Sequence, residues 1–274
     1  MKILCLTPIK HLKGVYEKLE SFGEVCYHPN INKHDFKFLF MNYYDVIFCN
    51  PNKQNYVLDK QTLRNFNGVI ITASTGLNHI DLDYCKNNDI KVLSQKKDYE
   101  LLNDLPSTSE LAFGLMLSIL RNIPNGFDDV KKGGWDYDKF MGHQLKGKTI
   151  GIVGYGRLGK MMERYCEAFG MVVIIDDPYE GYNNIDLLKS ESDIISLHVH
   201  ANDETHHMID KKFLDCMKKN SYIINTSRGE IVNESDIINH LNHMSRASVV
   251  VIVLIVAATA AGVIVAIAAA IAVA

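Results

Sequence analysis

The sequence predicts an α/β protein built from two Rossmann-like, doubly wound parallel-sheet domains, and three observations carry this prediction. Short apolar runs alternate with stretches of helical spacing in residues 1–100, and the same alternation returns from residue 149. A glycine-rich turn joins the first expected strand of the second series to a helix. A long apolar segment, residues 107–124, lies between the two series.

The first series predicts a flavodoxin-like domain over residues 1–100. Its expected strands are short and rich in Val, Ile, Leu and Cys, and they cover residues 2–6, 24–28, 45–49, 68–74 and 90–94. Helical spacing marks the segments between them, residues 13–23, 37–44, 59–66 and 79–89. Strands that alternate with helices are typical of a parallel sheet covered on both faces.

The segment between the two series predicts one long buried helix. It opens with Ser and Thr residues ahead of Glu110, which indicates an N-terminal cap, and it is expected to end at Pro124. Because it is apolar on nearly all sides, we expect it to lie between two domains or at a subunit interface. The glycine-rich and charged residues 131–148 then predict a loop.

The second series predicts a domain over residues 101–274. Expected strands cover residues 149–154, 171–176, 193–199 and 221–225, and expected helices cover residues 157–170, 184–192 and 210–219. The boundary between the two domains is expected near residue 100.

Three glycines in G-x-G-x-x-G spacing predict a dinucleotide site in the second domain. Gly154 allows a tight turn, Gly156 lets the backbone approach a pyrophosphate, and Gly159 lets the helix pack close to the strand. The N-terminus of that helix offers free N–H groups to phosphates. Asp177 lies 23 residues after Gly154, where a carboxylate accepts hydrogen bonds from ribose hydroxyls and repels a 2′-phosphate. The pattern therefore favours NAD over NADP.

Composition excludes some functional classes. Hydrophobic residues make up 47% of the chain and charged residues 22%, as in folded globular proteins. The net charge of −3 gives no basis for nucleic-acid binding. The six cysteines are scattered without a C-x-x-C pair, which predicts reduced thiols in a cytoplasmic protein and no metal site. The short apolar run at the N-terminus breaks at Pro8 and indicates a strand, not a secretory signal.

The last part of the sequence has an unusual composition. From Val249 to Ala274 there are 26 residues without a charge, and as a helix they would span roughly 39 Å. Three interpretations fit: a membrane anchor, a buried strand and helix, or letters that only approximate the true sequence over residues 247–274. The abrupt change to a small alphabet favours the third. A membrane anchor would lack the flanking basic and aromatic residues of an interface.

Several of these segments together resemble the D-isomer-specific 2-hydroxyacid dehydrogenases, the family that includes phosphoglycerate dehydrogenase and glyoxylate/hydroxypyruvate reductase. The resemblance rests on "ASTGLNHIDL", "LKGKTIGIVGYGRLGK", "IIDDPY" and the stretch from "SDIISLHVH" to "NTSRGEIVNE", and it covers roughly residues 1–244. It implies a substrate domain, an NAD domain, interconversion of a 2-oxo acid and a D-2-hydroxy acid, and a homodimer formed largely by NAD-domain surfaces.

Roles carry over to the positions that match the family's motifs. The resemblance implies that Arg228 binds the substrate's carboxylate and 2-oxo group, and a guanidinium suits this because it forms paired, planar hydrogen bonds. The loop at residues 74–76 is expected to offer N–H groups to the same carboxylate. The full set of expected substrate contacts is Ser74, Thr75 and Gly76, and the expected cofactor contacts are Gly154, Gly156, Arg157, Leu158, Gly159, Asp177, Val199, His200, Thr226 and Ser227.

Two departures from the family pattern leave alternatives open. His200 stands where the family usually has proline, and the histidine and glutamate that the family uses for proton transfer after the arginine have no evident match, because the last histidine is His243. His198 is a weak substitute, since the family commonly has histidine there without using it as the acid. The alternatives are a catalytically inactive NAD-binding module that drives dimerisation or regulation, and a membrane-anchored form.

Overall fold

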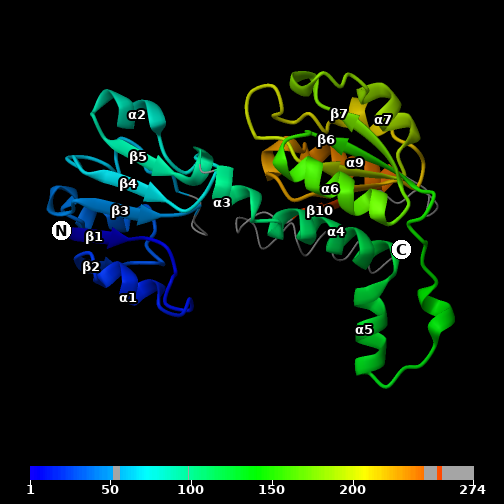
Figure 1. The fold of residues 1–274 in the computed structure, drawn as a ribbon, viewed down its shortest axis with the longest axis horizontal. Coiled ribbons are helices and arrows are strands. Elements are labelled where there is room, and N and C mark those ends of the chain that lie inside the picture. Colours follow the sequence, from blue (N-terminus) through cyan, green and yellow to red (C-terminus); the bar gives the residue numbers. More distant parts are fainter. Residues whose placement is uncertain (52–55, 98, 244–251, 255–274) are drawn as a thin grey trace. The chain divides into compact units, whose positions relative to one another are not determined.

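The computed structural model describes residues 1–51, 56–97, 99–243 and 252–254 of the 274-residue chain. Backbone contacts divide the described chain into two compact units (Figure 1). The first covers Met1–Leu102 and the second begins at Asn103. The separate roles of these units as substrate domain and NAD domain stay predictions at this point.

The first unit contains a five-stranded parallel sheet in the order β2-β1-β3-β4-β5. The strands are β1 (Lys2–Cys5), β2 (Glu24–Tyr27), β3 (Val46–Cys49), β4 (Val69–Thr72) and β5 (Lys91–Ser94). All neighbouring strands run parallel, and Cys49 at the end of β3 pairs with Thr72 at the end of β4. This strand order is the flavodoxin-like one, so the predicted fold class is confirmed for this unit.

Short helices connect these strands. They are α1 (Val15–Glu20), η1 (Asp35–Phe38), η2 (Met41–Tyr43), α2 (Leu82–Asn87) and η3 (Gln95–Lys97), and α3 (Tyr99–Asn103) follows the last strand. The prediction of one helix over residues 37–44 was wrong, because Phe40 adopts an extended backbone between two single 3-10 turns. Residues 59–66 form turns instead of a helix. There the Asp59 carboxylate accepts the N–H groups of Gln61 and Thr62, as the N-cap of a helix does, but Asn65 adopts the left-handed conformation with φ 64° after little more than one turn.

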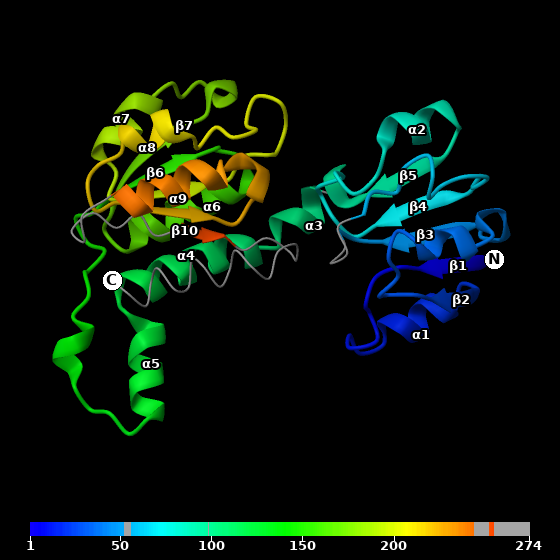
Figure 2. The same cartoon turned by 180° about the vertical axis from the view of Figure 1, so that it is seen from behind.

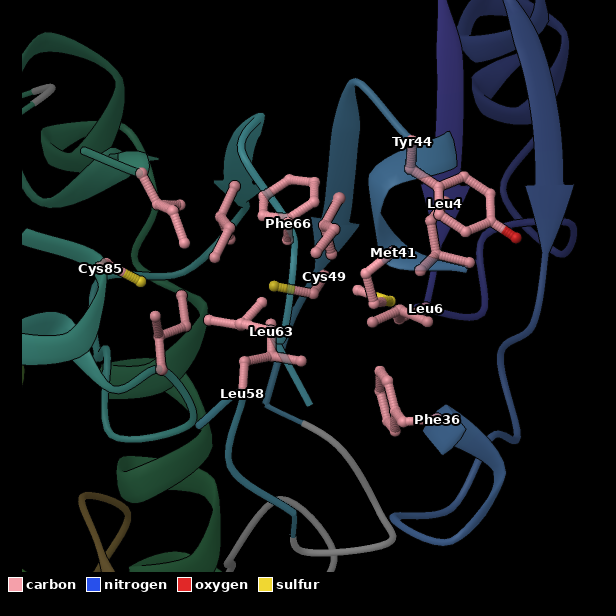
Figure 3. Close-up of a cluster of buried hydrophobic side chains, with 14 of the residues drawn as sticks. Leu4, Leu6, Phe36, Met41, Tyr44, Cys49, Leu58, Leu63, Phe66 and Cys85 are labelled. Carbon is pink, nitrogen blue, oxygen red and sulfur yellow. The ribbon is translucent and has the colours of Figure 1, made fainter. Parts of the chain in front are cut away.

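One buried cluster fills the first unit. Figure 3 shows side chains from β1, β3 and the connecting segments gathered in it, among them Leu4, Cys49, Leu63 and Phe66. Leu4 and Leu63 are fully buried. Burial of whole apolar side chains contributes about 1.5–3 kcal/mol each, so this cluster provides the main stabilisation of the sheet against its helices.

The second unit contains a parallel sheet in the order β10-β9-β8-β6-β7. Its strands are β6 (Thr149–Val153), β7 (Val172–Asp176), β8 (Ile194–Leu197), β9 (Tyr222–Asn225) and β10 (Ile252–Leu254). The connecting elements are α6 (Arg157–Ala168), η5 (Pro178–Glu180), α7 (Ile185–Glu191), α8 (Lys211–Asp215), η6 (Gly229–Ile231) and α9 (Glu234–His243). Separate buried clusters contain Leu197 and Ile223 in one case and Ile152 and Met162 in the other. This confirms the predicted Rossmann-like fold of the unit.

The segment before β6 departs from the prediction of one helix. It forms α4 (Ser107–Leu120) and α5 (Ile123–Lys131), separated by Asn122 in the left-handed conformation with φ 52°. Pro124 lies in the first turn of α5 and does not end a helix, because proline needs no N–H partner there. The predicted Ser/Thr cap was also wrong, since Pro106 is the N-cap and makes no side-chain cap bond.

Helix α4 packs on α6, and α5 projects away from the sheet of this unit (Figures 1 and 2). Ala112, Met116 and Leu120 of α4 are buried, whereas Leu111 is exposed. The expectation that α4 is buried on all sides therefore does not hold within one chain. The loop that follows α5 contains η4 (Tyr137–Phe140), and the His143 N–H donates to the Leu120 carbonyl at the end of α4.

Part of the apolar tail belongs to the second sheet. Ile252, Val253 and Leu254 form β10, which pairs in parallel with β9. This strand agrees with the interpretation of the tail as folded structure, but most of residues 247–274 lies outside the described residues. The described part of the chain contains no helix that is long and apolar enough to cross a membrane.

Candidate cofactor and substrate sites

The strand order of the second unit has its topological switch point between the carboxyl ends of β6 and β8. Connections from these two neighbouring strands leave in opposite directions, since β7 lies on one side of β6 and β9 lies beyond β8. Ligands of open parallel sheets bind at such a switch point. The predicted cofactor residues follow β6, β7, β8 and β9 directly, so the fold brings their backbone segments to one edge of one sheet.

The glycine turn after β6 has the geometry that a dinucleotide site requires. Gly154 has φ +91°, and a Cβ there would lie 2.8 Å from the His198 carbonyl carbon. A Cβ on Gly159 would lie 2.2 Å from the Gly154 carbonyl oxygen, so this glycine permits the close approach of α6 to the turn. A Cβ on Gly156 would meet no atom within 4 Å. Packing within the chain therefore explains the first and third glycines but not Gly156, whose open side suits a bound phosphate.

The start of α6 presents its backbone to this open side. Gly156 is the N-cap and makes no side-chain cap bond, which leaves first-turn N–H groups and the positive end of the helix dipole available. Arg157 begins the helix, and its Nη1 donates to the Leu105 carbonyl over 2.7 Å. Leu158 accepts a hydrogen bond from the Ser109 hydroxyl at its carbonyl over 3.1 Å, which fixes α4 against the start of α6.

Asp177 connects the end of β7 to the glycine turn. Its Oδ2 accepts the Tyr155 N–H at 2.7 Å, and its Oδ1 accepts the Tyr179 N–H at 3.1 Å. These bonds hold the carboxylate beside the turn, as the prediction of a ribose-binding acid requires. The preceding residue, Asp176, is buried, and desolvation raises the pKa of its carboxyl group. Asp176 accepts the Asn184 N–H and so has a structural role.

Arg228 lies in a turn that Asn225 organises. The Asn225 Oδ1 accepts both the N–H and the hydroxyl of Ser227, at 2.9 and 2.7 Å, and its Nδ2 donates to the Arg228 carbonyl at 2.8 Å. The Arg228 Nη1 donates to the Ser227 carbonyl at 2.8 Å. No acidic side chain forms an ion pair with Arg228 in the described part of the chain, so its charge is available to an anion.

Sequence reasoning did not identify Asn225, which is only 1% exposed. The signal that could have found it is a polar residue at the end of an otherwise apolar strand, since a buried amide needs hydrogen-bond partners.

The segments after β8 and β9 add polar groups to the same edge. The Leu197–Asn225 register places His198 beside Thr226 along the two backbones. The His198 Nε2 lies 2.9 Å from the Ser196 hydroxyl, and burial lowers the pKa of this imidazole to about 4. Neither the His198 Nδ1 nor the Thr226 Oγ1 has a hydrogen-bond partner among the described residues, although both atoms are buried. Such atoms favour a polar ligand at this edge.

The other two predicted contacts after β8 differ in exposure. Val199 is half-buried, and its Cγ1 lies 2.9 Å from the position that a Cβ on Gly154 would take. His200 is exposed, and its carbonyl accepts the Thr205 hydroxyl. Val199 therefore lines the glycine turn, whereas His200 helps to shape the loop that follows.

The predicted substrate loop belongs to the first unit and follows β4. Thr72 ends the strand, and its hydroxyl lies 2.8 Å from the Ser74 hydroxyl, which donates to the Gly76 carbonyl at 2.9 Å. Within the described residues, the N–H groups of Thr75 and Gly76 have no hydrogen-bond acceptor. Two free N–H groups in one short turn can bind an anion.

Comparisons with known proteins identify the family. Residues 113–254 match the sequence profile of the D-isomer specific 2-hydroxyacid dehydrogenase NAD binding domain. This match covers more than half of the chain, so the chain belongs to the D-isomer specific 2-hydroxyacid dehydrogenase family. The resemblance seen in the sequence is confirmed, and so is the prediction of a Rossmann-like NAD-binding domain.

Individual relatives are similar over part of their length. Glyoxylate reductase from Thermococcus litoralis is 36% identical over 203 residues, covering 67% of this chain and 60% of that protein. Hydroxypyruvate reductase from Thermotoga maritima is 36% identical over 173 residues, covering 61% of this chain and 55% of that protein. The chain thus spans about half the length of the curated relatives it matches.

Solved structures agree on the fold. NAD-dependent formate dehydrogenase from Staphylococcus aureus, in complex with NAD, has a TM-score of 0.75 at 27% identity, covering 88% of this chain and 78% of that chain. D-Lactate dehydrogenase from Aquifex aeolicus has a TM-score of 0.72 at 24% identity, covering 92% of this chain and 75% of that chain.

Proposed function

We propose that this protein is an NAD-dependent oxidoreductase that interconverts a 2-oxo acid and a D-2-hydroxy acid. The observation that carries the proposal is Arg228, whose guanidinium forms no ion pair among the described residues and whose backbone Asn225 holds at the same sheet edge as the glycine turn of an NAD-binding domain. The glyoxylate and hydroxypyruvate reductases among its relatives support a small 2-oxo acid as the substrate class.

The residues of the second unit would hold the cofactor through distinct contacts. The first turn of α6, with Gly156, Arg157, Leu158 and Gly159, would bind the pyrophosphate through N–H groups and the helix dipole. Asp177 would accept hydrogen bonds from the adenosine ribose, and Val199 and His200 would line the adenine side. Thr226 and Ser227 would lie near the nicotinamide, which supplies or accepts the hydride when bound.

Arg228 would orient the substrate and stabilise charge. Its guanidinium would form paired hydrogen bonds to the substrate's carboxylate and carbonyl oxygens, which polarises the carbonyl as hydride arrives at its carbon. In the first unit, the loop of Ser74, Thr75 and Gly76 would bind a carboxylate of the substrate through backbone N–H groups.

The proton donor is a separate matter. Burial lowers the pKa of His198 to about 4, so this imidazole is neutral at pH 7 and a poor general acid. His240 lies on α9, and its Nδ1 is 3.9 Å from the carboxylate of Asp215, the last residue of α8. We therefore assign neither histidine to proton transfer. The family resemblance implies a histidine–glutamate pair for this step, and that pair has no evident match in this sequence.

Ligand binding and turnover test this proposal in two steps. NADH fluorescence is expected to change on titration with the protein, and NADH is expected to be oxidised with glyoxylate, hydroxypyruvate or phosphohydroxypyruvate. The variant Arg228→Lys keeps the charge but loses the planar pair, and we expect it to raise KM for the acid at least about tenfold. Arg164→Lys, at an exposed position of α6, is the matched control.

The outcomes separate the two functional classes. Protein that binds NADH but oxidises it with none of these acids would contradict the enzyme and favour the NAD-binding module. Equal KM values for Arg228→Lys and the control would remove Arg228 from the substrate site.

We also propose that the protein is a homodimer formed through α4, α5 and the loop that follows. Large apolar side chains are exposed along this part of the second unit: Ile123, Phe127, Val130, Trp135, Tyr137 and Met141. Trp135 is 88% exposed, and a set of this size on a projecting helix and loop is typical of an interface (Figure 2).

Light scattering tests the dimer. We expect twice the chain mass for the wild type and a lower mass for Phe127→Lys combined with Val130→Lys. Phe38→Lys, an exposed aromatic residue of the first unit, is the control and is expected to leave the mass unchanged. A monomeric wild type would refute the dimer.

A further inference from the structure

A buried chain of hydrogen bonds connects His79 to the loop at residues 74–76. His79 is 6% exposed, and its Nε2 lies 3.1 Å from the Thr72 hydroxyl. Thr72 is also buried, and its hydroxyl lies 2.8 Å from that of Ser74, which donates to the Gly76 carbonyl. All four groups lie in the first unit, so these hydrogen bonds do not depend on how the two units are placed.

The direction of each bond follows from the last one. The Ser74 hydroxyl has one hydrogen, and the Gly76 carbonyl can only accept, so Ser74 must accept from Thr72. The Thr72 hydroxyl therefore donates its one hydrogen to Ser74 and must accept a hydrogen bond from His79. The His79 Nε2 therefore carries a hydrogen. A histidine without that hydrogen would reverse or break the chain at Thr72.

The backbone holds the imidazole at the start of this chain. The His79 carbonyl accepts the Leu58 N–H at 2.9 Å, and Leu58 and Ile80 form a parallel bridge. Leu58 is 1% exposed and Ile80 is 4% exposed, so this contact is part of the core of the unit. Because the backbone that carries the His79 ring is held in place, the Nε2–H of the ring can fix the orientation of the Thr72 hydroxyl. Through that hydroxyl it also fixes the loop at residues 74–76.

We propose that His79 is a positioning residue for the substrate, acting through Thr72 and Ser74 on the loop that presents the N–H groups of Thr75 and Gly76. This inference rests on the proposed function, because it takes the loop to be the carboxylate site of a 2-oxo acid. The Nε2–H donor fixes the Gly76 carbonyl through the hydroxyls of Thr72 and Ser74. Loss of the donor frees the Thr72 hydroxyl to rotate and loosens the turn that holds the N–H groups in place.

Variants of two positions test the chain in the full-length protein. His79→Leu removes the donor, whereas His79→Gln keeps an N–H the same number of bonds from Cβ. Thr72→Val removes the hydroxyl at nearly constant volume, and Thr72→Ser keeps it. Thr62→Val is the matched control, because Thr62 is buried in the same unit and its hydroxyl bonds to Asp59, not to the loop.

The readout is binding of oxamate, a stable 2-oxo acid analogue, to the NADH-loaded protein by calorimetry. We expect His79→Leu and Thr72→Val to raise the Kd for oxamate about tenfold, which is the effect of losing one to two hydrogen bonds. His79→Gln, Thr72→Ser and Thr62→Val are expected to stay within about threefold of the wild type. The Kd for NADH is expected to be unchanged in all five, which a general loss of folding would not produce.

A tautomer measurement provides an independent readout. Nitrogen-15 correlation spectra of histidine-labelled protein, assigned by the signal lost in His79→Gln, are expected to show a hydrogen on Nε2. A hydrogen on Nδ1 alone would overturn the inference whatever the ligand results.

The two proposals can fail separately. Wild-type protein that binds NADH but not oxamate would overturn the proposed function and the role of the loop. Wild-type protein that binds oxamate, with His79→Leu binding it equally well or His79→Gln failing like His79→Leu, would overturn only the role of His79.

Discussion

Gly156 and Gly159 are three residues apart in the same turn, yet the structure predicts opposite consequences for their replacement by alanine. At Gly156 a Cβ would meet no atom within 4 Å, and the backbone angles, φ −73° and ψ −161°, suit any residue. At Gly159 a Cβ would lie 2.2 Å from the Gly154 carbonyl oxygen, which is part of the backbone and cannot rotate away. Gly156→Ala should therefore report on the ligand, and Gly159→Ala on the fold.

The magnitudes follow from these contacts. Gly156→Ala loses about 0.5–1 kcal/mol as a poorer N-cap and regains a similar amount from the unfolded chain, so stability should change by less than about 1 kcal/mol. A methyl group against the pyrophosphate should cost about 1–3 kcal/mol of binding, or an affinity for NADH about 5- to 150-fold weaker. Gly159→Ala should cost about 3 kcal/mol of folding, which lowers Tm by about 6–12 °C.

Thermal unfolding without cofactor and fluorescence titration with NADH measure the two effects separately. Gly114→Ala is the control, because this exposed glycine of α4 also has open space around a new Cβ. It should leave the affinity for NADH unchanged. The reasoning is refuted if Gly156→Ala binds NADH like the wild type, or if it lowers Tm as much as Gly159→Ala does.

Three further predictions concern the same sheet edge. Replacing Asp177 with Ser should raise the affinity for NADPH relative to NADH at least about tenfold, measured by paired titrations, because the carboxylate that repels a 2′-phosphate is gone. Burial lowers the pKa of His198 from 6.5 to about 4, so as the pH falls the unfolded protein takes up a proton at His198 before the folded protein does. Stability should thus be full above pH 6.5 and fall by about 3 kcal/mol toward pH 4, and urea unfolding of His198→Asn should lack this slope. Asn225→Ala should cost about 3 kcal/mol of stability and raise KM for the acid more than KM for NADH, because it leaves the Ser227 N–H and the Arg228 carbonyl without partners; equal changes in both KM values would contradict this.

The strands could be predicted closely because each is a short apolar run between polar segments, and such runs fit only a sheet covered on both faces. The helices were predicted less well where a residue in the left-handed conformation interrupts a stretch of helical spacing. Residues 59–66 have helical spacing, but Asn65 turns the chain with φ 64°. Pro124 was expected to end a helix and instead begins one, since a proline suits the first turn after a break as well as the end before it.

In the candidate site, too, the sequence pattern predicts less than the packing of the folded chain shows. The spacing of Gly154, Gly156 and Gly159 predicted a cofactor turn, but only the positions of neighbouring atoms distinguish the two glycines that the fold requires from the one that a ligand would require. Asn225 acts indirectly, through the Ser227–Arg228 turn, and His79 acts indirectly, through Thr72. No spacing rule therefore reveals these two residues. Both are buried polar residues whose hydrogen bonds end on the backbone of a loop expected to bind an anion. A buried polar group beside such a loop is therefore a more direct indication of a positioning role than an exposed charge near it, because its hydrogen bonds to the loop are made away from water.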